Sequence, residues 1–298
     1  MRIAAADIGG TDIKYALVNE GGTLHLLKSP TPAGGGEVIV RHVGDLIESL
    51  GAFDAVAVCT AGQVDPEKGE ILYANENIPG YTGTRVKALI EARFQRPALV
   101  LNDVNAAALG EGALGAARGF DDYLCLTYGT GIGGAIVIGG KLYEGATHSA
   151  GEFGHIVTHR GGERCACGGR GCYERYASAA ALTRAAEKRL GERLDGYELF
   201  GRLGEAKVKR LVDDWAEEIL TGIASLCHIF NPACVVVGGG IMDQPYLVAR
   251  LQARFPRHIM PSFASVQLRR AELGNSAGIQ GAVTTLKRKL KDDGYTGA

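Results

Sequence analysis

The chain has 298 residues, of which 46% are hydrophobic and 22% are charged, and its formal net charge is −1 at pH 7. That length allows one large domain or two ordinary domains with ample core. A charge so close to zero gives no electrostatic reason to expect nucleic acid or an anionic membrane as a partner.

The first residues lack the pattern of a signal peptide, and no uninterrupted apolar stretch reaches the ~18 residues of a membrane span. We therefore expect a cytoplasmic protein in which most of the seven cysteines are reduced. Four cysteines lie inside apolar runs and are interpreted as small buried side chains: Cys59, Cys125, Cys227 and Cys234.

Two segments of the chain share one pattern of strand, Gly-Thr turn, strand, Gly-Gly turn and strand. They are residues 2–27 and residues 121–145, and Gly10-Thr11 in the first corresponds to Gly129-Thr130 in the second. This repetition predicts two related domains, each opening with a loop of the size that holds a phosphate. Chance similarity between glycine-rich hairpins is the alternative explanation.

The segments between and after these hairpins alternate between helical and strand periodicity. Helices are predicted at residues 36–51, 83–95, 104–117, 178–202, 205–230 and 278–290. Strands are predicted at residues 53–62, 97–103 and 232–241. The alternation predicts an α/β fold with mainly parallel sheets, divided into domains near residues 102–103.

Glycine-rich turns follow three apolar strands, at residues 7–11, 129–134 and 238–240. Glycine lets the backbone approach a phosphate and point N–H groups at it, so three such turns favour a nucleotide site. One such turn alone would not indicate a nucleotide site, because glycine after a strand is more often part of an ordinary turn. Asp7 is a candidate for holding Mg²⁺ through water, whereas Lys14 either reaches a phosphate or is an exposed strand lysine. The second turn leads into a strand rather than a helix, which argues against a dinucleotide fingerprint.

Asn102 and Asp103 lie at the carboxyl end of a predicted strand, where α/β folds place their ligands. A carboxylate there can take the proton of an alcohol that attacks a phosphoryl group. The alternative is that Asp103 only caps the helix that follows.

One histidine and three cysteines lie close together in the sequence with the spacing H-x9-C-x-C-x4-C: His155, Cys165, Cys167 and Cys172. Four such ligands suit a tetrahedral zinc ion, and a Cys₃His set is structural because it leaves no open coordination position. A disulfide is not expected in a cytoplasmic chain, and a redox pair is more often C-x-x-C. Free or redox-active thiols remain the alternative to zinc.

Two glutamates flank this stretch, Glu152 three residues before the histidine and Glu174 two residues after the last cysteine. If His155 gives one ring nitrogen to zinc, the other nitrogen is left to donate a hydrogen bond. The histidine and the two carboxylates would then form a cluster suited to a polyol. For each glutamate taken alone, an ordinary solvated surface position is the alternative.

Taken together, the motifs of the chain resemble those of the ROK family of bacterial sugar kinases and repressors, within the actin/Hsp70/hexokinase ATPase superfamily. The similar segments, in the family's order, are "DIGGTDIK", "LTYGTGIGG", "NDVNAAALGE", "GEFGH…CACGGRGCYE" and "VVVGGG". The resemblance implies two actin-like (ribonuclease H-like) α/β domains with a cleft between them. They would comprise residues 1–103 and 104–282, with a zinc loop at 155–172 and a C-terminal helix at about 283–298 packed back on the first domain.

The resemblance also implies the roles of individual residues in an ATP-dependent sugar kinase, with Asp103 as the general base for the 6-hydroxyl of the sugar. The implied sugar contacts are Gly62, Asn77, Asn102, Asp103, Glu152, His155 and Glu174. The implied zinc ligands are His155, Cys165, Cys167 and Cys172. The implied ATP and Mg²⁺ contacts are Asp7, Gly9, Gly10, Thr11, Lys14, Thr130, Gly131, Gly133 and Gly239. A homodimer is implied as well.

The segment "NENIPGY" is similar to the "NLPGW" segment of glucokinases, except that Tyr81 stands where they have tryptophan. Glucose is therefore the first expected substrate, followed by N-acetylmannosamine and then by fructose or a β-glucoside. A non-catalytic sugar sensor or repressor of the same family is a further alternative. It is disfavoured, because such repressors carry an N-terminal helix-turn-helix and here the first hairpin begins at Ile3.

Overall fold

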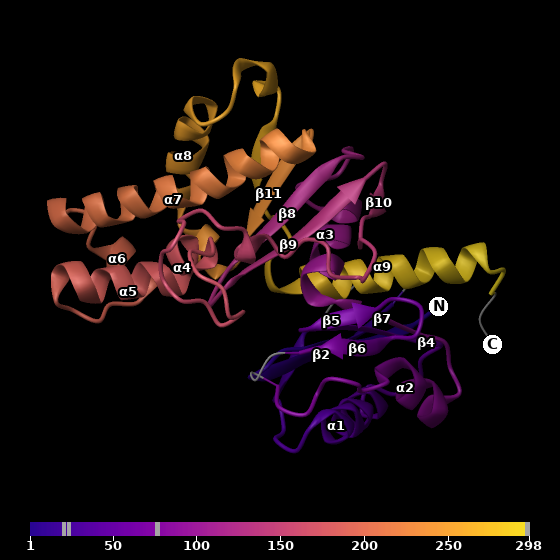
Figure 1. Ribbon diagram of the computed structural model, residues 1–298. Helices are drawn as coiled ribbons and strands as arrows, with labels where there is room; N and C mark the ends of the chain where they lie inside the picture. The colour runs from indigo at the N-terminus through magenta and orange to yellow at the C-terminus, as the bar shows by residue number, and fades with distance from the viewer. Residues whose placement is uncertain (20–21, 23–24, 75–77, 296–298) are drawn as a thin grey trace. The chain divides into compact units, whose positions relative to one another are not determined.

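The computed structural model describes residues 1–19, 22, 25–74 and 78–295, and the chain divides into two compact units (Figure 1). The first unit comprises Met1–Gly115, Glu144–Ala150 and Asn275–Ala298. The second comprises Ala116–Tyr143 and Gly151–Gly274. This division differs from the boundary expected at residue 103, because the helix that begins there packs against the C-terminal helix and stays in the first unit.

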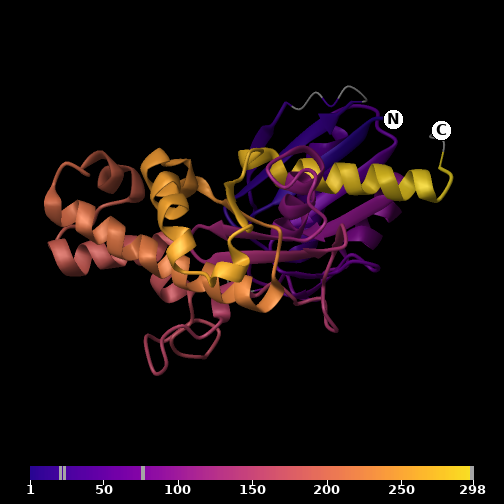
Figure 2. The ribbon, with the colours of Figure 1, turned by 90° about the horizontal axis from the view of Figure 1, so that it is seen from above.

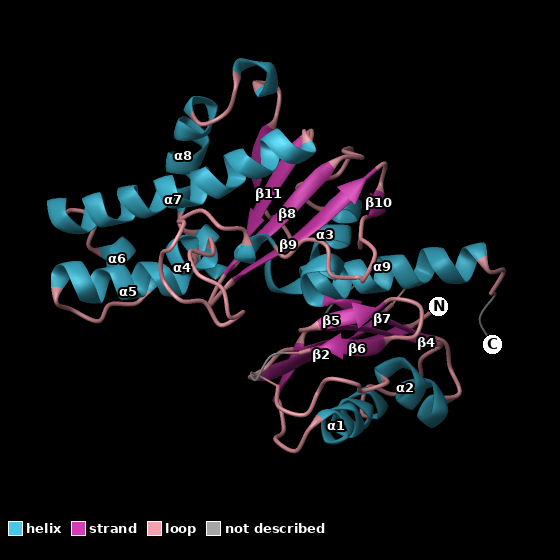
Figure 3. Cartoon of the chain, in the orientation of Figure 1, coloured by secondary structure: helices cyan, strands magenta, loops and turns pink. Residues whose placement is uncertain are grey.

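The first unit is built on a five-stranded sheet with the order β3-β2-β1-β4-β7 (Figure 3). Its strands are β1 (Ile3–Ile8), β2 (Asp12–Val18), β3 (Leu27–Pro30), β4 (Ala55–Thr60) and β7 (Ala98–Asn102). Strands β1, β4 and β7 are parallel, and β1 to β3 form the predicted antiparallel meander. β1 and β4 are buried on both faces, which explains why their sequences are continuous apolar runs rather than alternating ones.

Two pairs of helices enclose this sheet. On one face, α1 (Gly36–Glu48) and α2 (Val86–Phe94) bury Ile39, Val43 and Ile90 against the even-numbered residues of β1. On the other face, α9 (Ala277–Asp292) buries Ile279 and Leu286 against the odd-numbered residues. A small hairpin of β5 (Gln63–Asp65) and β6 (Glu70–Tyr73) follows β4.

The helix α3 (Asp103–Leu114) lies against α9, as Figures 1 and 2 both show. The two helices approach closely at Gly110 and Gly281, where an added Cβ atom would meet the backbone of the other helix. The small residues predicted for α3 are therefore explained by helix–helix contact rather than by solvent exposure.

The second unit repeats the first, with a sheet in the order β10-β9-β8-β11-β12. Its strands are β8 (Tyr123–Tyr128), β9 (Ile132–Ile138), β10 (Lys141–Leu142), β11 (Cys234–Gly238) and β12 (Gln267–Arg270). The meander is again antiparallel, and β8, β11 and β12 are again parallel. The repeat predicted from the two glycine-rich hairpins is confirmed.

The helices of the second unit are α4 (Glu174–Ala177), α5 (Ala179–Leu190), α6 (Gly196–Gly201), α7 (Ala206–Phe230) and α8 (Pro245–Arg254). The prediction of a single helix over residues 178–202 is wrong. The chain leaves α5 at Gly191, which adopts a left-handed φ of 75°, and starts α6 with a capping box between Asp195 and Glu198. Among the described residues, no helix is long and apolar enough to cross a membrane.

Candidate functional site

Three parallel strands of the first unit end in register, so that the residues after them meet at one edge of the sheet. Ile8 of β1 pairs with Thr60 of β4, and Thr60 pairs in turn with Asn102 of β7. The carboxyl edge of a parallel sheet is where α/β folds bind their ligands. The predicted residues Gly9, Gly62 and Asp103 therefore follow neighbouring strand ends.

Asn102 is the residue that caps α3. Its Oδ1 accepts hydrogen bonds from the backbone N–H groups of Val104 at 2.9 Å and Asn105 at 3.0 Å. Its Nδ2 donates to the carbonyl oxygen of Gly62 at 3.0 Å and to Oδ1 of Asp103 at 2.9 Å. The capping role that the sequence left open for Asp103 thus belongs to its neighbour, and Asp103 is the first residue of the helix itself.

The half-buried carboxyl group of Asp103 is tuned by its surroundings. Burial and then the negative charge of Asp7 raise its pKa to about 6, against the opposing effect of hydrogen bonds from the Val104 N–H and the Asn102 amide. A carboxylate whose pKa lies just below neutral pH is mostly ionised there and accepts a proton more readily than an ordinary aspartate. The group is chemically suited to act as a base.

Asp7 and Lys14 face each other across the first hairpin. They are directly paired in the register of β1 and β2, and Lys14 Nζ lies 3.4 Å from Asp7 Oδ2. Burial raises the pKa of Asp7, and the ammonium group of Lys14 opposes that effect. Lys14 is therefore partnered to a carboxylate, rather than being the unpaired exposed lysine that the sequence allowed.

Cys59, which sequence reasoning assigned only to the core, lies next to these carboxyl groups. It pairs with Asp7 in the register of β1 and β4, and its thiol contacts the carbonyl oxygen of Ala6 at 3.7 Å. Burial and the charges of Asp7 and Asp103 raise its pKa well above the ordinary value. The apolar run around this cysteine gave no signal of that neighbourhood.

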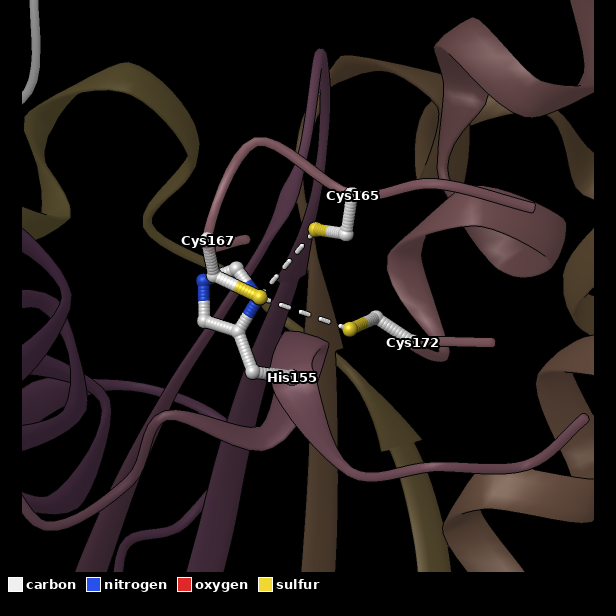
Figure 4. A group of neighbouring side chains, drawn as sticks. All are labelled: His155, Cys165, Cys167 and Cys172. Carbon is white, nitrogen blue, oxygen red and sulfur yellow. Dashed lines mark hydrogen bonds between the residues drawn. The ribbon is translucent and has the colours of Figure 1, made fainter. Parts of the chain in front are cut away.

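In the second unit, the four predicted metal ligands converge (Figure 4). One ligand atom from each of His155, Cys165, Cys167 and Cys172 lies within 4.8 Å of all the others. Sγ of Cys167 lies 3.6 Å from Sγ of Cys172, and Sγ of Cys165 lies 3.6 Å from Nδ1 of His155. Ligand atoms about 2.3 Å from a tetrahedral zinc are themselves separated by roughly 3.8 Å, so the donor set and its spacing fit that ion.

The loop that carries the cysteines has a backbone suited to this cluster. The N–H of Cys165 donates to Gly169 and that of Gly168 donates to Cys165, which closes a tight turn around Cys167. The N–H of Gly169 lowers the pKa of the Cys167 thiol, which favours the thiolate that a metal requires. Gly171 adopts a left-handed φ of 76°, and an added Cβ would meet the backbone of His159. None of the seven cysteines forms a disulfide in the structure.

Glu152 and Glu174 lie on either side of the His155 ring. Nε2 is 3.8 Å from Oε2 of Glu152, and Nδ1 is 3.9 Å from Oε1 of Glu174. Because Nδ1 also faces the sulfur of Cys165, Nε2 is the nitrogen left for a ligand hydroxyl. The structure brings the histidine and both glutamates together, as the sequence predicts.

The two glycine-rich turns of the second unit follow neighbouring strands. β8 and β11 are parallel, with Thr127 opposite Gly238, so the turn after Tyr128 and the turn at Gly239 are adjacent. Gly239 has a φ of 95°, and an added Cβ would meet the backbone of Tyr128. Thr130 is exposed in the first of these turns.

Gly133 lies inside β9, opposite Thr127, rather than in the turn itself. Gly131 lies against Glu174, since a Cβ added there would be 2.7 Å from Oε2 of that residue. Asn77 lies outside the described residues.

Solved structures share this arrangement along the whole chain. A ROK hexokinase from Thermus thermophilus is 36% identical with a TM-score of 0.85, over 98% of this chain and 100% of that one. A ROK glucokinase from Streptomyces griseus, solved with glucose and AMPPNP, is 33% identical with a TM-score of 0.84, over 97% and 100% of the two chains. With the paired hairpins and their loops, these likenesses assign the protein to the ATP-dependent sugar kinases.

The family follows from the sequence as a whole. The model of the ROK family matches residues 3–289, and the chain belongs to this family. A curated relative, the β-glucoside kinase of Listeria monocytogenes, is 33% identical over 95% of this chain and 96% of its own length.

Proposed function

We propose that the protein transfers the γ-phosphoryl group of ATP to the 6-hydroxyl of a hexose, with Asp103 as the general base. The observation that carries this proposal is the carboxyl group of Asp103, whose pKa is raised to about 6 and whose Oδ1 accepts a hydrogen bond from Asn102. In the reaction, the 6-oxygen bonds to the γ-phosphorus as the bond to the β,γ-bridging oxygen breaks. The hydroxyl proton passes to the Asp103 carboxylate.

The sugar is held, in this proposal, by the residues that the family resemblance implies. Their side chains or backbone groups bind hydroxyls and so fix the acceptor oxygen against Asp103, because positioning is the main contribution to phosphoryl transfer. The proposed contacts are Gly62, Asn77, Asn102, Glu152, His155 and Glu174. The partly buried hydrogen bond from Asn102 to Gly62 supports the rigidity that this positioning requires.

The nucleotide is held, in this proposal, by the glycine-rich turns. Backbone N–H groups of Gly10, Gly131 and Gly239, with the hydroxyls of Thr11 and Thr130, bind the phosphates and the adenosine. Gly9 shapes the first turn, because its own N–H donates to the carbonyl oxygen of Asp12 at 3.1 Å. Lys14 contributes positive charge, and Asp7 suits a magnesium ion held through water beside the phosphates. When bound, that ion would neutralise the charge that develops on the transferred group.

Zinc has a structural role in this proposal. A Cys₃His set leaves no open coordination position, so the ion would hold the loop and fix the His155 ring with Nε2 free for the sugar. The spacing of the four ligand atoms supports it. The zinc does not take part in the transfer of the phosphoryl group.

Glucose is the first proposed substrate, because the relative from Streptomyces griseus was solved with glucose. N-acetylmannosamine is the second candidate, followed by fructose and β-glucosides. A non-catalytic sugar sensor is disfavoured because the carboxyl group of Asp103 is retained. We further propose a cytoplasmic homodimer, on the family resemblance alone.

A coupled assay of ADP release tests the proposal. Purified protein with ATP and Mg²⁺ is given glucose, N-acetylmannosamine, N-acetylglucosamine, fructose and methyl β-glucoside in turn, and we expect turnover with at least one of them. Absence of ADP release above the ATPase background with every sugar would refute the kinase function, and the rank order of kcat/KM identifies the substrate.

A further inference from the structure

The second unit contains a cavity that the proposed catalytic machinery does not use. Its volume is about 290 Å³, and it lies between α4, α5, α7 and Glu163 of the loop that carries the cysteines. These three helices pack on one another in the second unit (Figure 1). The described residues that line the cavity include neither a predicted zinc ligand nor a proposed contact with sugar or ATP. The volume lies near the lower end of the range for ligand pockets and suits a small molecule.

The side chains that line this cavity carry more positive than negative charge. The basic ones are Arg175, Arg184, Lys188 and Arg189, and the acidic ones are Glu163, Asp214 and Glu218. The first two acids pair with Arg175 and Arg189, at N···O distances of 3.1 Å and 2.7 Å respectively, and the third faces His159 at 3.6 Å. Within the part of the chain that the structure describes, Arg184 and Lys188 have no carboxylate partner. Positive charge therefore remains at the cavity.

Arg184 and Lys188 project from one face of α5, because they are four residues apart in this helix. Nη2 of Arg184 donates to the carbonyl oxygen of Arg175 at 2.9 Å, which holds the guanidinium group in place. Burial and then the positive charge of Arg175 lower the pKa of Arg184, so the two guanidinium groups are close enough to repel each other. Nε of Arg175 is buried and has no hydrogen-bond partner among the described residues. An anion bound beside these groups would offset the repulsion and offer them acceptor atoms.

The chemistry of the lining favours a phosphate group on a molecule that also carries hydroxyl groups. Guanidinium groups bind the oxygens of a phosphate through paired hydrogen bonds, and an ammonium group adds a point charge. The carboxylates of Glu163 and Glu218 accept hydrogen bonds and would suit the hydroxyls of the same molecule. A small polyol with one phosphate group matches both kinds of partner.

We propose that this cavity binds a small phosphorylated polyol, with its phosphate group on Arg184 and Lys188. The binding is non-covalent, and the phosphate group is not transferred. The site shares no residue with the proposed contacts for sugar and ATP, and binding there does not depend on the proposed function.

The cavity lies next to a proposed sugar contact in the chain. Arg175, which lines it, directly follows Glu174 at the start of α4. The hydroxyl of Tyr176 accepts a hydrogen bond from the N–H of Glu163 at 2.7 Å, which joins α4 to the loop that carries the cysteines. A bound ligand should therefore change the KM for the sugar, and this part of the inference rests on the proposed function.

The test uses the fluorescence of Trp215, which is the only tryptophan of the chain and lines the cavity. The wild type, Arg184→Gln, Lys188→Gln and Arg257→Gln are titrated with glycerol 3-phosphate, glycerate and glycerol at constant ionic strength. Arg257 is an exposed residue of the same unit outside the cavity, so its variant is the matched control for the loss of one charge. Calorimetric titration measures the same affinities independently, and thermal unfolding checks that each variant keeps its fold.

We expect saturable binding of glycerol 3-phosphate to the wild type, weaker binding of glycerate and none of glycerol. The dissociation constant should rise about tenfold or more in Arg184→Gln, rise also in Lys188→Gln, and stay within about twofold in Arg257→Gln. Stronger binding of glycerate than of glycerol 3-phosphate would show a carboxylate site and overturn the inference. Absence of saturable binding to the wild type by both methods, or equal affinities in all four proteins, would overturn it as well.

A kinetic measurement tests the link to the sugar. With a substrate identified by the coupled assay, saturating glycerol 3-phosphate should change the KM for the sugar about fivefold or more in the wild type and leave it unchanged in Arg184→Gln. An unchanged KM in the wild type would overturn this link. Absence of kinase activity with every sugar would instead overturn the proposed function, and the titrations would still decide whether the cavity binds the ligand.

Discussion

Asn102 donates a hydrogen bond of 2.9 Å from its side-chain amide to Oδ1 of Asp103, while its other side-chain atom caps α3. One residue thus fixes the direction of the neighbouring carboxyl group and satisfies the backbone at the start of the helix. Mutation can therefore separate catalysis from local stability, because Asn102 caps the helix whereas Asp103 carries the carboxyl group.

Asp103→Asn should lose activity and gain stability. The amide cannot accept the hydroxyl proton, so we expect kcat to fall by roughly 10²–10⁴-fold. The unfolding free energy at pH 7 should rise by about 1–2 kcal/mol, because a half-buried charge facing Asp7 is removed. Coupled-assay kinetics and thermal unfolding measure the two effects, and calorimetric titration should find sugar binding retained. Turnover at the wild-type rate would rule out Asp103 as the base.

Asn102→Ala should lower both stability and turnover. Loss of the cap should cost about 1 kcal/mol, and the freed Asp103 carboxyl should lower kcat further. Ser178→Ala is the matched control, because Ser178 caps α5 by accepting a hydrogen bond from the N–H of Ala181 at 3.1 Å. The control should show a similar fall in the unfolding midpoint with kcat near that of the wild type. Equal kinetic effects in the two variants would contradict a positioning role for Asn102.

The pH dependence of kcat/KM should follow Asp103. Its base form is the deprotonated carboxylate, so activity should rise as pH increases through about 6 and then level off. The folded pKa lies above the ordinary value of 3.8, so this group stabilises the fold most when protonated, and that contribution is lost between pH 3.8 and about 6. Asp103→Asn should remove this part of the pH dependence of stability. If the stability of Asp103→Asn still changes with pH near pH 4 as that of the wild type does, another group is responsible for this part of the pH dependence.

Removal of zinc should weaken sugar binding more than nucleotide binding. We expect about one zinc per chain in protein purified without chelator, and its loss in Cys167→Ser, since an alcohol is a far poorer zinc ligand than a thiolate. The His155 ring would then lose its anchor, and KM for the sugar should rise with a smaller change for ATP. Cys227→Ala, at a buried cysteine of α7, is the control that should keep the metal. Protein without zinc that keeps wild-type kinetics would refute this role.

The buried tyrosines of the second unit should respond unequally to loss of their hydroxyl groups. Tyr173 donates to the carbonyl oxygen of Ile219 at 2.6 Å, so Tyr128 must donate to the Tyr173 oxygen at 2.9 Å. Tyr128→Phe removes one hydrogen bond and should cost about 1 kcal/mol. Tyr173→Phe removes two hydrogen bonds and leaves the buried Tyr128 hydroxyl without its acceptor, so it should cost about 2–3 kcal/mol. Chemical denaturation curves give the order, and a larger effect for Tyr128→Phe would contradict the assigned direction.

Much of this fold could be predicted from the sequence, because the patterns that indicate its strands, turns and helices are local. The hairpin at Gly10-Thr11 and its repeat at Gly129-Thr130 share turn chemistry and strand pattern, and the long α7 has clear helical spacing. The missed elements are short or irregular. α8 begins at Pro245, and the edge strand β12 has four residues, of which only Leu268 is buried. The break between α5 and α6 depends on Gly191 and on the capping box of Asp195 and Glu198, and the sequence pattern is equally compatible with these residues inside one helix.

The residues of the candidate site could be predicted from the sequence, but their geometry could not. The spacing of His155 and the cysteines identified the cluster, but which ring nitrogen faces the sulfur depends on the path of the loop. Asn102 and Asp103 were both singled out, yet only the hydrogen bonds show which of them caps α3. The pairing of Tyr128 with Tyr173 joins residues 45 positions apart, and no local pattern could give it.

The place of α9 in the first unit has a consequence for how the chain folds during synthesis. Ile279, Val283, Leu286 and Leu290 complete the apolar cluster on one face of a sheet whose strands all lie before residue 103. A ribosome releases these residues only after the whole second unit, so their part of that face stays uncovered while the second unit is being made. The second unit has its own core within residues 116–274 and is complete first. The first unit is therefore completed by a helix that follows the whole second unit in the chain, and deletion of α9 would remove most of the apolar side chains that cover this face of the sheet.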